Sequence, residues 1–117
     1  LKGQIMGGVA HGIGQALLEE IQFDTDSGQL VTGSFMDYTM PRADNMSYID
    51  VMSNPCPTAT NPLGCKGAGE AGTVGAVPCV MNAVVDALSE YGIQHIDMPA
   101  TPAKIWAAIN RAKNRAA

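Results

Sequence analysis

The residues best suited to chemistry lie in one glycine-rich segment, residues 61–72, with the sequence Asn-Pro-Leu-Gly-Cys-Lys-Gly-Ala-Gly-Glu-Ala-Gly. Four glycines surround one lysine, Lys66, and one carboxylate, Glu70. Glycine adopts backbone conformations that other residues avoid, and such a loop exposes N–H groups that bind anions. A carboxylate in its middle would repel a phosphate. We therefore expect Glu70 to point at a reacting centre while the flanking amides hold the body of a cofactor.

The same segment matches the dinucleotide-binding pattern G-x-G-x-x-G at Gly67, Gly69 and Gly72. That pattern requires an apolar strand before the first glycine and an acidic residue after a second strand. Here the preceding residues are Pro-Leu-Gly-Cys-Lys, and Asp86, at about the expected distance, falls inside a helical pattern. Glu70 would also lie against the pyrophosphate. The context argues against a dinucleotide fold, and the sequence contains no G-x-x-x-x-G-K-[ST] phosphate loop.

The cysteines and histidines do not follow the spacing of a metal site. Cys56, Cys65 and Cys79 fit neither a zinc site nor a disulfide framework, so we expect reduced thiols. His11 and His95 lie far apart, with no cysteine or carboxylate at ligand spacing. We therefore expect no metal held by protein side chains.

The overall composition is that of a folded domain without a nucleic-acid-binding surface. The chain has 117 residues, of which 46% are hydrophobic and 15% charged, and a formal net charge of −4. Seven basic residues provide no face that would follow a phosphate backbone. The sequence has no run of about 18 apolar residues that would span a membrane. It begins without a methionine or an apolar signal segment, and we expect a part of a longer, cytoplasmic protein.

Three helices are predicted around the glycine-rich segment. Apolar residues recur with a helical period over residues 8–20 and over residues 77–88, and the second helix should end near Gly92. A third helix opens with Thr101-Pro102 as N-cap and first-turn proline. Its expected buried face consists of Ile105, Trp106 and Ile109.

The first predicted helix is rich in glycine. Within a helix each glycine costs up to about 1 kcal/mol relative to alanine. Either another element or a ligand must therefore approach this backbone closely, and the sequence leaves both alternatives open. The glycines concerned are Gly7, Gly8, Gly12 and Gly14.

Several short segments have the pattern of strands. Residues 21–24 and 29–32 flank a Thr-Asp-Ser-Gly turn and predict a β-hairpin, residues 48–52 predict a third strand, and residues 94–97 a short fourth. Residues 54–75 have neither period, which is typical of a functional loop. We therefore predict an α+β fold with two layers, a small mixed sheet carrying two or three helices on one face.

Residues 66–72, followed by a helix, resemble the glutamate loop of the molybdenum hydroxylases, the family of xanthine dehydrogenase, aldehyde oxidase and aerobic carbon monoxide dehydrogenase. Other segments resemble the family in the same order. They are the glycine-rich helix at residues 4–17, Asp-Tyr-Thr-Met-Pro at residues 37–41, and Pro-Ala-Thr-Pro at residues 99–102 with Trp106. The resemblance covers nearly the whole chain and is strongest to bacterial carbon monoxide dehydrogenase-like large subunits.

The resemblance implies an activity and a set of site residues. Residues 1–117 would be the C-terminal fragment of a molybdopterin-binding domain, in the catalytic subunit of a molybdenum-containing oxidoreductase. That enzyme would hydroxylate an aldehyde or an N-heterocycle, or oxidise carbon monoxide. Glu70 would be the general base, His11 would approach the pterin, and Lys66 would have no catalytic role. The other cofactor-binding residues would be Gly67, Ala68, Gly69, Ala71 and Gly72.

The resemblance also implies cofactors and partners. The complete enzyme would bind a molybdenum pterin cofactor, as molybdopterin cytosine dinucleotide, with the metal held by the pterin. The isolated chain is expected to bind none. The partners would be the remainder of the large subunit, iron–sulfur and flavin subunits, and a small-molecule substrate. The alternative hypothesis is a stand-alone, inactive fragment or an assembly module that keeps the fold and binds no cofactor.

Overall fold

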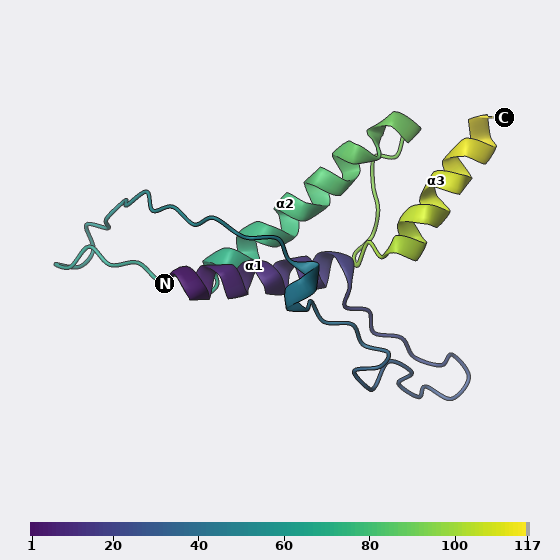
Figure 1. The fold of residues 1–117 in the computed structure, drawn as a ribbon, viewed down its shortest axis with the longest axis horizontal. Coiled ribbons are helices and arrows are strands. Elements are labelled where there is room, and N and C mark those ends of the chain that lie inside the picture. The colour runs from purple at the N-terminus through teal and green to yellow at the C-terminus, as the bar shows by residue number, and fades with distance from the viewer. Residues whose placement is uncertain (117) are drawn as a thin grey trace.

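The computed structural model describes residues 1–116, which form helices joined by long irregular segments (Figure 1). The elements are α1 (Lys2–Leu17), η1 (Ala43–Asn45), α2 (Ala71–Ala87), η2 (Ser89–Tyr91) and α3 (Pro102–Ala116). Helices α1 and α2 lie side by side, and α3 lies next to the far end of α2. No helix among the described residues is both long and apolar enough to cross a membrane.

The predicted α+β fold with a mixed sheet is wrong, because the described part of the chain contains no sheet. The expected hairpin forms only an isolated antiparallel bridge between Phe23 and Leu30, with Gly28 at φ +71° in the turn. Residues 48–52 and 94–97 form no strand. A strand requires a partner backbone as well as a suitable pattern. Among residues 1–116 those segments have no such partner.

Small residues allow α1 and α2 to pack backbone against backbone. A Cβ added at Gly12 would lie 2.6 Å from the Cβ of Ala76, and one added at Gly8 would lie 3.0 Å from the backbone nitrogen of Thr73. A Cβ at Gly72 would collide with the carbonyl oxygen of Ile5. At Gly8 and Gly12 the predicted close approach is therefore made by a second helix. Gly14 instead faces the side chains of Glu19 and Pro41, and Gly7 is open.

The boundaries of these two helices differ from the predicted ones. Helix α1 begins at Lys2 and ends at Leu17, whereas α2 begins at Ala71, inside the segment predicted as a loop. The first turns of α2 consist mainly of small residues that fit against α1, so they carry no apolar period. After η2 the chain turns at Gly92, which has φ +69° as expected for a left-handed cap.

Helix α3 begins where the sequence predicted it. The backbone N–H of Lys104 donates to the Thr101 hydroxyl over 3.4 Å, as expected for an N-cap. The predicted buried face of this helix is only partly correct. Ala108 is buried and Ile105 packs against the core, but Trp106 is 70% exposed. The core combines Ile96, Ala100 and Ala108 with partly buried residues of α1, α2 and α3.

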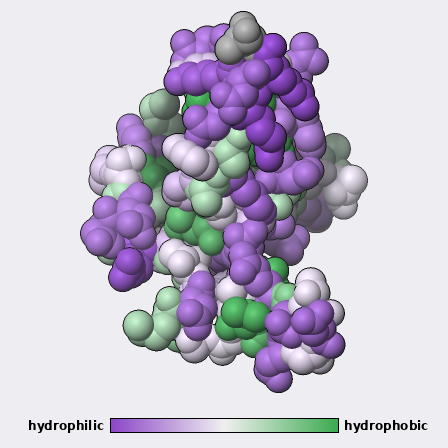
Figure 2. Space-filling model, turned by 90° about the vertical axis from the view of Figure 1, so that its right-hand side faces the viewer, coloured by the Kyte–Doolittle hydropathy of each residue, from purple (hydrophilic) through white to green (hydrophobic). Residues whose placement is uncertain are grey.

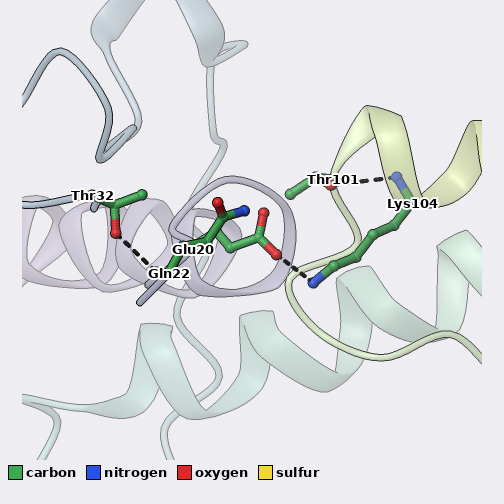
Figure 3. Close-up of polar contacts among 5 residues, drawn as sticks. All are labelled: Glu20, Gln22, Thr32, Thr101 and Lys104. Atoms are coloured by element: carbon green, nitrogen blue, oxygen red, sulfur yellow. Dashed lines mark hydrogen bonds and ion pairs between the residues drawn. The ribbon is translucent and has the colours of Figure 1, made fainter. Parts of the chain in front are cut away.

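Polar contacts connect the start of α3 and the long arm after α1 to the end of α1. Figure 3 shows the Lys104 ammonium reaching the Glu20 carboxylate, at a distance of 2.8 Å. The arm, residues 18–42, folds back on its own start just after α1, where the Tyr38 hydroxyl donates to the Glu19 carboxylate over 2.5 Å. This hydrogen bond raises the pKa of Tyr38, because the neutral phenol is the donor that the carboxylate needs. The region around residues 16–20 is thus the junction of the fold.

Candidate active site

Glu70 is the last residue before α2, at its N-cap position, and is exposed. Its backbone carbonyl accepts a hydrogen bond from the N–H of Val74 over 3.0 Å, which closes the first helical turn. The side chain makes no capping hydrogen bond. The backbone of Glu70 is therefore fixed, and its carboxylate is not engaged in a capping hydrogen bond.

Two side-chain hydrogen bonds join the glutamate loop to α1. The side-chain amide of Gln4 donates to the carbonyl oxygen of Gly69 over 2.8 Å. The hydroxyl of Thr73 donates to the carbonyl oxygen of Gly8 over 2.9 Å. Since these contacts lie on either side of Glu70 in the sequence, they hold its backbone against α1. The sequence analysis missed Gln4, and its only signal was its place in the glycine-rich helix segment.

Asn61 organises the loop that leads to Glu70. Its side-chain oxygen accepts hydrogen bonds from the N–H groups of Leu63 and Cys65, both over 3.1 Å, and its amide donates to the carbonyl of Cys65 over 2.9 Å. Gly64 adopts φ +65°, and its carbonyl accepts from the N–H of Thr58 over 3.1 Å. Sequence reasoning missed Asn61 as well, although Asn-Pro before a glycine is a recognisable turn signal.

A groove of about 820 Å³ lies between α1 and the start of α2. From α1 it is lined by Gln4, Gly7, His11 and Gln15, among others, and Glu70 lies on its opposite wall. The structure thus brings the two predicted side chains, His11 and Glu70, into one groove. Gln15 is a further polar residue that the sequence analysis did not single out.

Only some of the predicted cofactor-binding residues line the groove. Gly69 lines the groove, and a Cβ at either Gly67 or Gly69 would meet nothing within 4 Å, so both backbones are open. Gly72 is instead buried against α1. Ala68 and Ala71 are not part of the groove lining. The structure therefore brings Gly69, Glu70 and His11 together and leaves the others outside the groove.

The remaining reactive side chains lie elsewhere. Cys56, Cys65 and Cys79 are exposed and free. His95 contacts Asp97 over 2.9 Å beside a second groove, between α2 and residues 93–98. Among the described residues, no group of three or more His, Cys, Asp or Glu side chains is arranged to hold a metal ion.

Most of this chain is similar in sequence to known proteins. Residues 1–47 match the model of the molybdopterin cofactor-binding domain. The nicotine 6-hydroxylase large subunit of Paenarthrobacter nicotinovorans is 41% identical over 90% of this chain. The carbon monoxide dehydrogenase large chain of Hydrogenophaga pseudoflava is 34% identical over 93% of it. This chain spans only 13% of the length of each relative.

The fold is also similar to that of a solved structure. The crystal structure of the Cu,Mo-CO dehydrogenase in its carbon monoxide reduced state superposes with a TM-score of 0.90 and 33% identity. The match covers 96% of this chain and 14% of that one. The chain therefore belongs to the molybdenum hydroxylase family and corresponds to a part of its molybdenum-cofactor-binding large subunit.

Proposed function

We propose that this chain is part of the catalytic subunit of a molybdenum-containing oxidoreductase, and that Glu70 is its general base. The observation that carries the proposal is the position of Glu70. Its carboxylate makes no capping bond, and it lines the groove that also contains His11. The relatives in which this segment occurs are a nicotine hydroxylase and a carbon monoxide dehydrogenase by name, which supports oxidation of a small molecule.

The groove has the properties that one wall of a pterin site requires. Gly7 and Gly69 leave their backbones open, since a Cβ at either position would meet nothing within 4 Å. Gln4, His11 and Gln15 supply donors and acceptors that suit the ring edges of a heterocycle. Among the described residues that line the groove, Glu70 is the one carboxylate. These residues fit a molybdenum pterin cofactor, and the groove, being open, forms one side of its site.

The residues of this chain then have distinct roles. When bound, the cofactor supplies the redox chemistry that removes electrons from the substrate. The open backbone at Gly69 and the polar side chains of α1 hold and orient the heterocycle. Glu70 accepts the proton that is released as the substrate is oxygenated, which is the work of a general base. The Gln4 contact to Gly69 fixes the peptide from which this carboxylate extends.

Finer features of the complete protein belong to the same proposal. The cofactor is the molybdopterin cytosine dinucleotide form, and the chain is the C-terminal part of its domain. The partners are the rest of the large subunit together with iron–sulfur and flavin subunits, in the cytoplasm. The names of the relatives, a large subunit and a large chain, support an assembly of several subunits. The substrate is an aldehyde, an N-heterocycle or carbon monoxide.

The test is Glu70→Gln in the complete enzyme. This substitution keeps the size and most hydrogen-bonding capacity of the side chain but removes its basic oxygen. We expect kcat to fall by about 10²–10⁴-fold with unchanged molybdenum content, because general-base catalysis contributes that much. The matched control is Glu90→Gln, on η2 and outside the groove, which should retain normal rates. Near-normal turnover of Glu70→Gln with full molybdenum content would exclude Glu70 as the base.

A further inference from the structure

The chain exposes far more surface than a closed domain of its size. Its radius of gyration is 18.3 Å, whereas a compact domain of this length has about 13 Å. Its accessible surface is 8723 Å², against about 6,000 Å² for a folded monomer of the same mass. The excess, roughly 2,700 Å², is in the range that obligate interfaces bury. Figure 2 shows hydrophobic side chains lying at the surface among hydrophilic ones.

Part of this surface is unpaired backbone. Among the described residues, none from 47 to 57 makes a backbone–backbone hydrogen bond. The segment begins after Met46, whose φ of −111° and ψ of 127° are those of a strand. In Figure 1 it runs from η1 as an extended trace toward the loop that projects beyond the N-terminus. A row of exposed N–H and C=O groups without partners is an open edge with which another strand can pair.

The side chains of this segment have the alternation of a strand. Ile49 and Val51 are half-buried, whereas Tyr48 and Met52 are 76% and 88% exposed. Successive side chains of a strand point to opposite faces, so Ile49 and Val51 share one face and Tyr48 and Met52 the other. The segment thus has the side-chain pattern of a strand and follows an extended course, without a neighbouring strand among the described residues.

We propose that residues 47–53 form a β-strand that pairs edge to edge with a strand from the remainder of the molybdenum hydroxylase large subunit. This partner follows from the proposed function, and the pairing itself requires no turnover. The shape of the chain is kept, at a TM-score of 0.90, in a solved carbon monoxide dehydrogenase of which it covers only 14%. The rest of such a polypeptide offers ample backbone to supply the partner strand.

A second copy of this chain is a poorer partner for the same edge. Asp50 is the central residue of the 48–52 pattern. An antiparallel pair of two such strands centred on Asp50 would place two carboxylates directly opposite each other, and like charges in that position are destabilising. Pairing through the backbone of a different segment avoids this repulsion.

Hydrogen–deuterium exchange tests the proposal. The chain would be measured alone and within its own complete large subunit. We expect the amides of residues 47–53 to exchange freely in the chain alone and at least 100-fold more slowly in the large subunit. Equal, fast exchange in both would overturn the proposal. Protection that appears in the chain alone and grows with its concentration would also overturn it, in favour of pairing between copies.

Substitutions at two neighbouring positions separate backbone pairing from side-chain packing. Successive N–H groups of a strand point to opposite edges, so either Asp50→Pro or Val51→Pro removes an N–H group that faces the partner, whereas Val51→Thr keeps a β-branched side chain and the N–H. In the large subunit, protection of the segment should be lost with one of the two prolines and kept with threonine. Equal protection in all three variants would contradict pairing through this edge. Molybdenum content and turnover, measured in parallel, report on the proposed function independently, since Glu70→Gln should abolish turnover without affecting this protection.

Discussion

The side-chain amide of Gln4 donates to the carbonyl oxygen of Gly69 over 2.8 Å and so connects the first turn of α1 to the peptide directly before Glu70. Sixty-five residues separate the two partners in sequence. On the other side of Glu70, the hydroxyl of Thr73 binds the carbonyl of Gly8. The backbone of the proposed base is therefore held from both directions by one helix, and the same helix contributes His11 to the groove.

Gln4→Leu should lower kcat of the complete enzyme by roughly ten- to a hundredfold, because displacing a catalytic group by about 1 Å costs up to 10²-fold. Rates are compared per bound molybdenum, because Gln4 is also one of the side chains proposed to hold the cofactor. Since Gln4 also lines the groove, amide exchange at Gly69 and Glu70 is the second readout and should become faster. Gln94→Leu, at the second groove, is the control. A change confined to KM would contradict a role in positioning Glu70.

Glu70→Asp keeps the charge but shortens the side chain by one methylene. The carboxylate then retreats from its reaction partner by about an ångström, so we expect roughly a 10²-fold loss of kcat. Single-turnover kinetics with full molybdenum loading would measure it. If the aspartate variant matched the native rate, the carboxylate would act through its charge alone and not as a base at a defined position.

Two glycines of α1 predict opposite responses to alanine. Gly12→Ala should lower the free energy of unfolding by about 1–3 kcal/mol, the usual cost of overpacking, because its Cβ would lie 2.6 Å from that of Ala76. Gly7→Ala should raise it by about 0.5–1 kcal/mol, since alanine is the better helix former and its Cβ would meet nothing within 4 Å. Urea unfolding of the two variants checks the pair. Equal effects would mean that α1 and α2 do not pack at Gly12.

Of the seven predicted site residues, three (Gly69, Glu70 and His11) line one groove in the structure, and their roles stay predictions. Glu70 between glycines was identified as the proposed base, and the structure places it and His11 in one groove. Gln4 escaped detection, since its role depends on a hydrogen bond to a backbone carbonyl 65 residues away. No local spacing encodes such a contact, and a glutamine on a helix surface is ordinary.

The fold was less predictable, for two physical reasons. Helix α3 was found because Thr101-Pro102 is a local start signal, and its structure agrees. The sheet was not found in this chain, because a period-two pattern such as residues 48–52 specifies a strand but not its partner. Trp106 was assigned to a buried face, yet it is 70% exposed. Its apolar character predicts burial, but the described residues leave most of it uncovered.

The ion pair between Glu20 and Lys104 predicts an acid-sensitive contribution to stability. The Lys104 ammonium, through its hydrogen bond and its charge, lowers the pKa of Glu20 below its ordinary value. The contribution is therefore present above the unfolded-state pKa and is lost as the pH falls through the lowered folded-state pKa. Both side chains are partly exposed, so Lys104→Met should cost no more than about 1 kcal/mol at neutral pH. Urea unfolding at neutral and acidic pH should show this difference shrinking in acid. Lys66→Met, on the glycine-rich loop, is the control and should show no such trend. A cost that persists below the lowered pKa would show that Lys104 stabilises the junction by packing and not by charge.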